Sequence, residues 1–249
     1  MEVHAHTRTE RKKFTHYLWE FLMLFLAVFC GFLAENFREH QVEHQREKQY
    51  ILSMIQDLET DTSNLNVLVK RFWKKNSLLD SIIRGYDQGT RSYDNTWAQQ
   101  FLLSYRGGFP DFYPTDRTIQ QLKNSGGLRL IRNEAAANGI ILYDAAVKDV
   151  KFEEEFLSSN QDRYIEEVLK VWSVNKMMKD AGVSSWTSNR NMEVKNNYWI
   201  TTDPIAFEHL FNRLAEYNEA ILHHKTDFEH LKGKATELIL LLKKEYRLK

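Results

Sequence analysis

The sequence predicts an all-α protein, with an N-terminal transmembrane helix followed by a long antiparallel helical hairpin or bundle that carries an inserted helical head. An uninterrupted apolar run near the N-terminus predicts the membrane helix, and two heptad patterns of equal length predict the arms of the hairpin. Only 10 Gly and 3 Pro occur in 249 residues, too few for a collagenous chain or for an all-β chain with many turns.

Charge and cysteine content exclude several functional classes. Lys plus Arg and Asp plus Glu both number 34, so the formal net charge is zero and we expect no nucleic-acid partner. A single Cys excludes an internal disulfide framework and a Cys-rich zinc module. Apolar residues make up 43% of the chain, enough to bury a sizeable core.

Residues 17–34, YLWEFLMLFLAVFCGFLA, form the predicted transmembrane helix, and the lipid bilayer is its expected partner. These 18 residues would span about 27 Å as an α-helix, close to a hydrocarbon core of roughly 30 Å. Tyr17 and Trp19 stand where interfacial aromatic residues are expected. We expect Glu20 at headgroup depth, in preference to the alternative of an intramembrane ionisable site.

Three alternatives to a permanent anchor fit less well. A cleaved signal peptide needs small residues before the cut, but Phe32 occupies such a position ahead of Ala34. A lipoprotein signal needs a small residue before its Cys, and here Phe29 precedes Cys30. A buried soluble helix would not normally have such strongly charged residues directly after it. We therefore predict an uncleaved signal anchor.

The distribution of basic residues predicts the orientation of the anchor. The tail of residues 1–16 contains Arg8, Arg11, Lys12 and Lys13 against only Glu2 and Glu10. After the span, basic residues alternate with glutamates. The positive-inside rule therefore predicts a cytoplasmic tail, with residues 35–249 on the far side, which in a bacterium is the periplasm. The predicted location is the bacterial inner membrane.

Small residues line one stripe of the predicted membrane helix. Ala27, Gly31 and Ala34 recur at steps of three and four residues, with Cys30 beside them. Such stripes let two membrane helices approach closely, although chance often produces them. Self-association through this stripe is one predicted interaction, and an envelope protein partner is the other.

Beyond the membrane, two arms repeat apolar residues at alternating three- and four-residue steps, the pattern of an a/d seam. The first arm covers about 35–86 and the second about 203–247. The first seam is Ile51, Ile55, Leu58, Thr62, Leu65, Val69, Phe72, Asn76, Leu79, Ile83 and Tyr86. The second seam is Phe207, Leu210, Leu214, Tyr217, Ile221, His224, Phe228, Leu231, Ala235, Leu238 and Leu242. We expect the polar seam residues Thr62 and Asn76 to fix the register.

The equal length of the seams predicts an antiparallel stalk, formed within one chain or between chains. Tyr86 would then lie near Phe207, and Ile51 near Leu242. Asp203, as a capping residue before a proline, predicts the start of the second arm.

Residues 87–202 supply the material for the predicted head. A short helix is expected from Thr118 to Asn124, and a longer one from Asn133 toward Asp180. Aromatic residues are dense near the start of the predicted head, where they form either part of the core or a patch that faces a partner. They are Trp97, Phe101, Tyr105, Phe109, Phe112 and Tyr113.

Two segments carry a resemblance to a known family. The single span continues into GFLAENFREHQVEHQREKQYILSMIQDLETD, and LKNSGGLRLIRN follows at Leu122–Asn133. Together they resemble a family of single-pass proteins common in Bacteroidota, catalogued as a domain of unknown function. The resemblance covers most of the chain and implies a bacterial inner-membrane protein with a helical periplasmic domain. It implies no catalytic residue and no ligand.

Candidate chemistry is sparse, and we predict no catalytic, cofactor-binding or metal-binding residues. His40 and His44 lie one turn apart but lack the zinc-hydrolase pattern, so a solvated helix face is expected. Asp227 and His230 follow His223 and His224, but the first arm offers no matching inward carboxylates. We expect His224 to be a buried histidine with its hydrogen bonds satisfied.

Two functional hypotheses follow. The first is a membrane-anchored periplasmic structural or interaction protein without catalytic activity, supported by the paired heptads and the absence of a convergent catalytic set. The alternative is a ligand-sensing helical domain. Because a tail of 16 residues cannot hold an output domain, such a sensor would have to signal through a membrane partner.

Overall fold

The computed structural model describes residues 14–88, 99–101, 103–104, 111–180 and 196–248. Its elements are α1 (Phe14–Asp87), α3 (Arg117–Asn124), the 3-10 helix η1 (Gly127–Leu130), α4 (Glu134–Val171), α5 (Val174–Asp180) and α6 (Pro204–Glu245). The described residues contain no strand, and a single antiparallel bridge joins Trp172 to Trp199. The all-α prediction is confirmed.

The chain divides into two compact units, residues 1–50 and 51–249, and the boundary falls inside α1. In the first unit, α1 contains one segment long and apolar enough to cross a membrane. The side chains of residues 17–34 are all exposed, including the small residues Ala27, Gly31 and Ala34. A Cβ added at Gly31 would meet no atom within 4 Å, so this stripe is open to a neighbouring helix.

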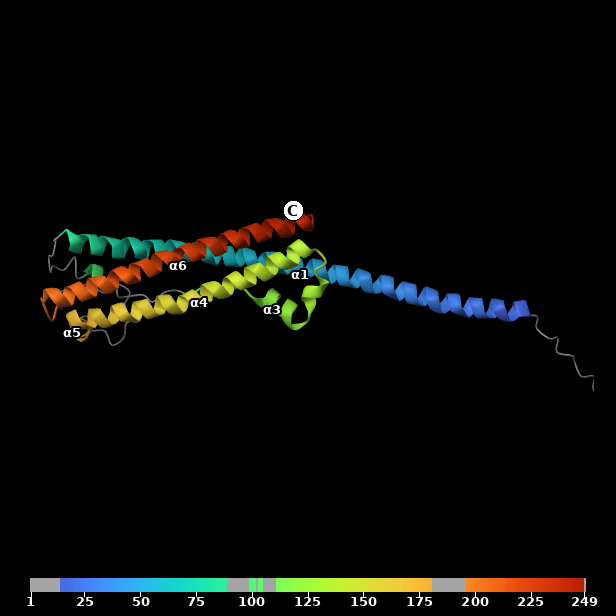
Figure 1. Cartoon of the computed structure of the whole chain (residues 1–249), viewed down its shortest axis with the longest axis horizontal. Helices are drawn as coiled ribbons and strands as arrows, with labels where there is room; N and C mark the ends of the chain where they lie inside the picture. Colours follow the sequence, from blue (N-terminus) through green and yellow to red (C-terminus); the bar gives the residue numbers. More distant parts are fainter. Residues whose placement is uncertain (1–13, 89–98, 102, 105–110, 181–195, 249) are drawn as a thin grey trace, which may run out of the picture. The chain divides into compact units, whose positions relative to one another are not determined.

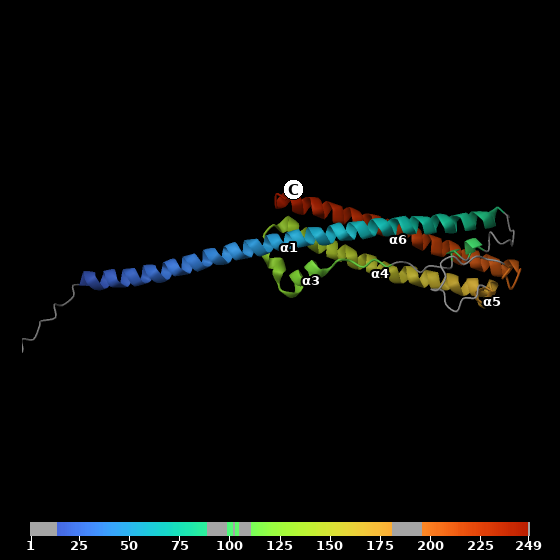
Figure 2. The same cartoon turned by 180° about the vertical axis from the view of Figure 1, so that it is seen from behind.

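The second unit is built on three long helices, α1 from Ile51 onward, α4 and α6 (Figures 1 and 2). The residues of the second predicted seam, which all lie on α6, are buried without exception. Three contacts show that α6 runs antiparallel to α1 within one chain. Glu59 pairs with Lys243 at 3.1 Å, the rings of Phe72 and Phe228 lie 5.2 Å apart, and Tyr86 stacks on Phe211 at 3.7 Å.

The register of this pairing is shifted from the predicted one, by one turn near Tyr86 and by more at the other end, where Lys243 pairs with Glu59 and the prediction placed Leu242 near Ile51. Tyr86 meets Phe211, one helical turn beyond the expected Phe207, and its hydroxyl donates to Glu208 at 3.2 Å. Asn76, predicted to fix the register, donates from Nδ2 to Oδ1 of Asn218 at 2.9 Å. This polar pair can form in only one alignment of the two helices.

The described part of residues 87–202, which holds the predicted head, belongs to the same compact unit as both arms. The longest element within this segment is α4, which packs along α6 as a third long helix of the bundle. The physical reason is that α4 carries its own buried stripe, which includes Ile140, Tyr143, Val150 and Leu157. A stripe of this length needs another helix as its cover.

The predicted helix from Asn133 toward Asp180 has the expected start but is interrupted near its end. Asn133 caps α4 by accepting a hydrogen bond from the amide of Ala136 at 2.9 Å. After Val171 the chain leaves the helix, and the amide of Ser173 donates to the carbonyl of Tyr198 at 2.8 Å. The start predicted at Asp203 is also confirmed, since its carboxylate caps α6.

Between α1 and α4, side chains form hydrogen bonds with the backbone of the described parts of the connecting chain, which we call the returning chain. The amides of Phe112 and Thr115 donate to Glu154 at 2.9 Å and to Asp61 at 2.7 Å. Farther along α1, Lys75 donates to the carbonyl of Ser104 at 2.5 Å. Backbone groups of such a connection require partners, because an unpaired buried amide or carbonyl costs free energy.

Two buried carboxylates of α1 form the centre of this network. Asp57 accepts from Arg117 Nε at 2.5 Å and from the backbone amide of Thr118 at 3.1 Å, at the start of α3. Asp61 also accepts from the Tyr143 hydroxyl at 2.8 Å, which links α1 to α4. Burial, and next the negative charge of Asp61, raise the pKa of Tyr143. Both carboxylates therefore hold separate segments against α1.

We predict that Asp57→Asn will lower the free energy of unfolding by about 2 kcal/mol. The side-chain NH2 group of Asn would face Arg117 and Thr118, which are themselves hydrogen-bond donors. Urea unfolding of the full chain in detergent measures this loss. Hydrogen exchange should show the largest loss of protection in residues 111–124.

Glu59→Gln is the matched control, two residues along the same helix. Glu59 is exposed and pairs with Lys243 on the surface, so the expected loss is about 0.5 kcal/mol or less. Equal losses for the two variants would contradict the structural role of Asp57.

Candidate functional site

The candidate histidines of the first unit lie on the solvated helix face that the sequence predicts. The side chains of His40 and His44 are 59% and 64% exposed, and each lies near a glutamate one turn later. In the ranges that the structure describes, no three His, Cys, Asp or Glu side chains are placed to hold a metal ion.

The aromatic residues of the predicted head belong mainly to the core where they are described. Phe101 and Phe112 are fully buried, whereas Tyr113 is 74% exposed. Phe101 contributes to a cluster of rings at the end of the bundle that also includes Trp172, Trp199, Phe207 and Phe211. Trp97, Tyr105 and Phe109 lie outside the described residues.

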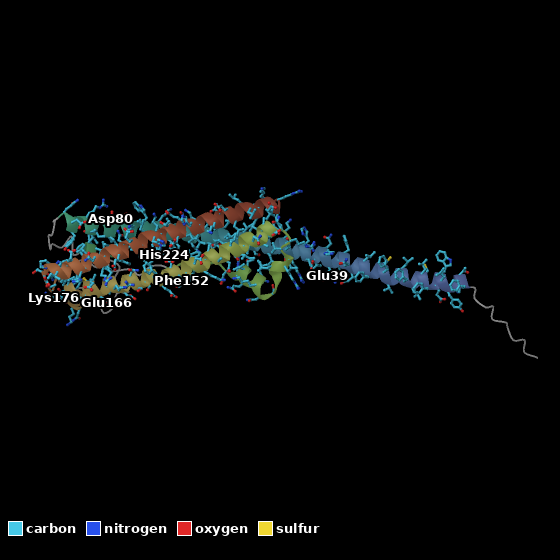
Figure 3. All side chains as sticks on the ribbon, in the orientation of Figure 1. Glu39, Asp80, Phe152, Glu166, Lys176 and His224 are labelled. Carbon is cyan, nitrogen blue, oxygen red and sulfur yellow. The ribbon has the colours of Figure 1, made fainter. Side chains whose placement is uncertain are left out.

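His224 is buried as predicted, but the expectation of satisfied hydrogen bonds is wrong. It lies on α6 (Figure 3) with its ring 4.5 Å from that of Phe228 and 5.6 Å from that of Phe72. Neither ring nitrogen has a hydrogen-bond partner among the described residues. The nearest carboxylate oxygen, Oδ2 of Asp227, is 3.8 Å from Nδ1, too far for a hydrogen bond.

Burial lowers the pKa of His224 to about 4, because an imidazolium among aromatic rings would lose its hydration. The charge of Asp227 opposes this shift, while His223 and Lys151 reinforce it. His224 is therefore neutral at neutral pH.

Asp227 lines a surface groove between α4 and α6, which the sequence analysis did not predict. The groove has a volume of about 240 Å³, and three carboxylates line it, from Asp149, Glu153 and Asp227. His223 and His230 also line it, and His223 Nδ1 lies 3.2 Å from Asp227 Oδ2. The available signal was the spacing, because these residues recur at three- and four-residue steps on each helix.

The carboxylates of this groove are largely uncompensated. Asp149 and Glu153 form no ion pair with any residue in the described part of the chain. Asp227 Oδ2 is buried and accepts no hydrogen bond there. The groove can therefore accept a cationic group that also donates hydrogen bonds.

An apolar groove adjoins the acidic one. It has a volume of about 350 Å³, and Leu142, Leu238 and Leu241 line it together with Gly139. Lys234 lines both grooves, so they are neighbours along the α4–α6 interface. A Cβ at Gly139 would come within 2.8 Å of Leu238, so glycine permits the close approach of the helices here.

Lys75 is a further group with a shifted pKa. Burial lowers its pKa to about 8. Its ammonium donates to the carbonyl of Ser104, so its evident role is to hold the returning chain.

Comparison of the chain with protein-family models, with curated proteins and with solved structures found no match. The resemblance to single-pass proteins of Bacteroidota therefore stays a prediction.

We predict that the stability of the second unit falls as the pH falls from about 6.5 to about 4. The pKa of a histidine is 6.5 when unperturbed and about 4 for His224 in the folded state. Protonation therefore favours unfolding, and stability that is complete above pH 6.5 is lost through this window, by on the order of 3 kcal/mol. His224→Leu should remove this part of the pH dependence, measured by urea unfolding at a series of pH values.

His223→Leu provides the matched control at the neighbouring position. The His223 side chain is 68% exposed, so its loss should leave the slope of stability against pH nearly unchanged. The same slope in wild type and His224→Leu would show that burial of His224 does not determine the acid sensitivity.

Proposed function

We propose that this protein is a membrane-anchored interaction protein without catalytic activity, whose second unit binds a partner protein of the cell envelope. The observation that carries the proposal is the outer surface of the bundle. Large apolar side chains are exposed there, notably Trp73 at 59%, Phe152 at 72% and Phe156 at 55%. Exposed aromatic residues of this size are typical of protein-binding surfaces.

The hydrogen bonds of the buried polar groups support the same proposal. Asp57, Asp61 and Lys75 are each bound to backbone of the returning chain. Tyr164 shares a hydrogen bond of 2.6 Å with Ser104. These groups hold the bundle together and leave its outer faces for recognition.

The proposed location rests on charge and hydropathy. Residues 17–34 anchor the protein in the bacterial inner membrane, the basic tail of residues 1–16 stays in the cytoplasm, and residues 35–249 lie in the periplasm. The resemblance to single-pass proteins supports the same arrangement.

Co-purification tests the proposed function. The tagged full chain, solubilised from its native membranes in mild detergent, should retain one envelope protein in near-stoichiometric amount by mass spectrometry. A chain truncated after Tyr50 controls for proteins carried along with the bilayer, and it should lose that partner.

A partner-free full chain would contradict the proposal. If native mass spectrometry then showed a bound small molecule, the ligand-sensing alternative would be favoured, and the α4–α6 groove would be the first place to look for it.

A reporter fused after Lys249 tests the orientation. We expect alkaline phosphatase, which is active only outside the cytoplasm, to be active in the fusion. Green fluorescent protein exported in unfolded form stays dark, so it should not fluoresce at the same position. The opposite pair of results would reverse the topology.

A further inference from the structure

The outer face of α1 carries a basic and aromatic surface that the bundle itself does not use. Lys70, Arg71 and Lys74 are exposed around the exposed ring of Trp73, with Val67 one turn earlier. These three cations form no ion pair with any described residue. We call these five residues the basic face.

The α4–α6 side of the same unit carries complementary chemistry. Asp149, Glu153 and Asp227 line the acidic groove, and Phe152 and Phe156 are exposed on α4 beside it. We call these five residues the acidic face. Each face thus combines a majority of charges of one sign with large exposed rings, although Lys234 also lines the acidic groove.

The two faces also lie at the same level along the bundle. Helices α1 and α4 both run antiparallel to α6, and the Asp61–Tyr143 hydrogen bond sets their relative level. Arg71 follows Asp61 by as many residues as Glu153 follows Tyr143, so Arg71 lies level with Glu153. By the same count, Val67 lies level with Asp149.

We infer that the basic face of one copy of this chain binds the acidic face of a second copy, side by side in the same membrane. This inference deepens the proposed function, on which it rests, by naming a second copy as one partner. Two copies that lie side by side with their bundles parallel bring Arg71 of one copy level with Glu153 of the next. Rings of Phe152 and Trp73 pack between the charged groups, where cation–π contact with Lys70 adds to the attraction.

The two faces are different surfaces, so this contact is heterologous. A copy that offers its basic face to one neighbour still has its acidic face available for another. Such contacts extend into a row or close into a ring.

Charge reversal tests the inference on the full chain in detergent. Sedimentation of wild type should show reversible self-association that weakens at high salt, since the contact is electrostatic at its centre. Arg71→Glu and Glu153→Arg should each weaken association by about tenfold or more. The double variant, or an equimolar mixture of the two single variants, should recover most of the wild-type affinity because the pair is restored with reversed charges.

Glu166→Arg and Lys176→Glu are the matched controls for net charge. They lie on α4 and α5, progressively farther along the bundle than Phe152 (Figure 3). Neither should change the association constant by more than about twofold.

Cross-linking in native membranes tests the geometry directly. In a Cys30→Ser background, one tagged chain carries Lys70→Cys and a differently tagged chain carries Glu153→Cys. A short bis-maleimide should join the two tags, whereas cysteines at Lys70 of both chains should not react with each other.

Several outcomes would overturn the inference. These are a monomeric wild type, association that Arg71→Glu leaves intact, or association abolished only by Gly31→Leu in the membrane stripe. An envelope protein that still co-purifies in any of these cases would leave the proposed function standing, so the two failures are distinguishable.

Discussion

The bundle depends on the hydrogen bonding of the chain that returns from the end of α1 to the start of α4. The start and end of a short helix, and the loops beside it, leave backbone amides and carbonyls that need other partners. Asp57, Asp61 and Lys75 of α1 supply that pairing, at spacings of four and fourteen residues that keep them on one side of the helix. Helix α1 thus acts as a partner for the backbone of the returning chain as well as for α6.

This arrangement explains why the connection can be packed against the helices. The carboxylate of Asp61 joins the returning chain to α4 through Tyr143, and Glu154 of α4 accepts from the amide of Phe112. The same connection places Phe112 in the core, where its ring lies 6.2 Å from that of Phe228 on α6. Polar and apolar contacts therefore fix the segment together.

The sequence was sufficient to predict the parts of the fold that depend on local periodicity. The seam of α6 and its cap at Asp203 follow from residue spacing alone, and both are confirmed. The position of α4 beside α6 was not predictable, because a buried stripe shows that a helix needs cover without showing which helix provides it. Aspartates in a helix are usually exposed, so nothing distinguished Asp57 from a surface residue.

The candidate surfaces were predictable in the same limited sense. Heptad spacing placed His224 in the core, but the lack of a hydrogen-bond partner depends on the rings of Phe72 and Phe228, which only the fold brings together. The acidic groove needs residues from two helices far apart in sequence, and their shared edge follows from the packing of α4 on α6.

The Asn76–Asn218 hydrogen bond joins residues 142 positions apart, and this separation has a consequence for biogenesis. At roughly 5–20 residues per second, about seven to twenty-eight seconds of translation separate the emergence of the two residues. Throughout this interval the α1 side chains that pack on α6 lack their partners, although the predicted anchor has already emerged. The nascent domain therefore exposes a long apolar helix face to chaperones and proteases. A chain interrupted before α6 would be a substrate for degradation.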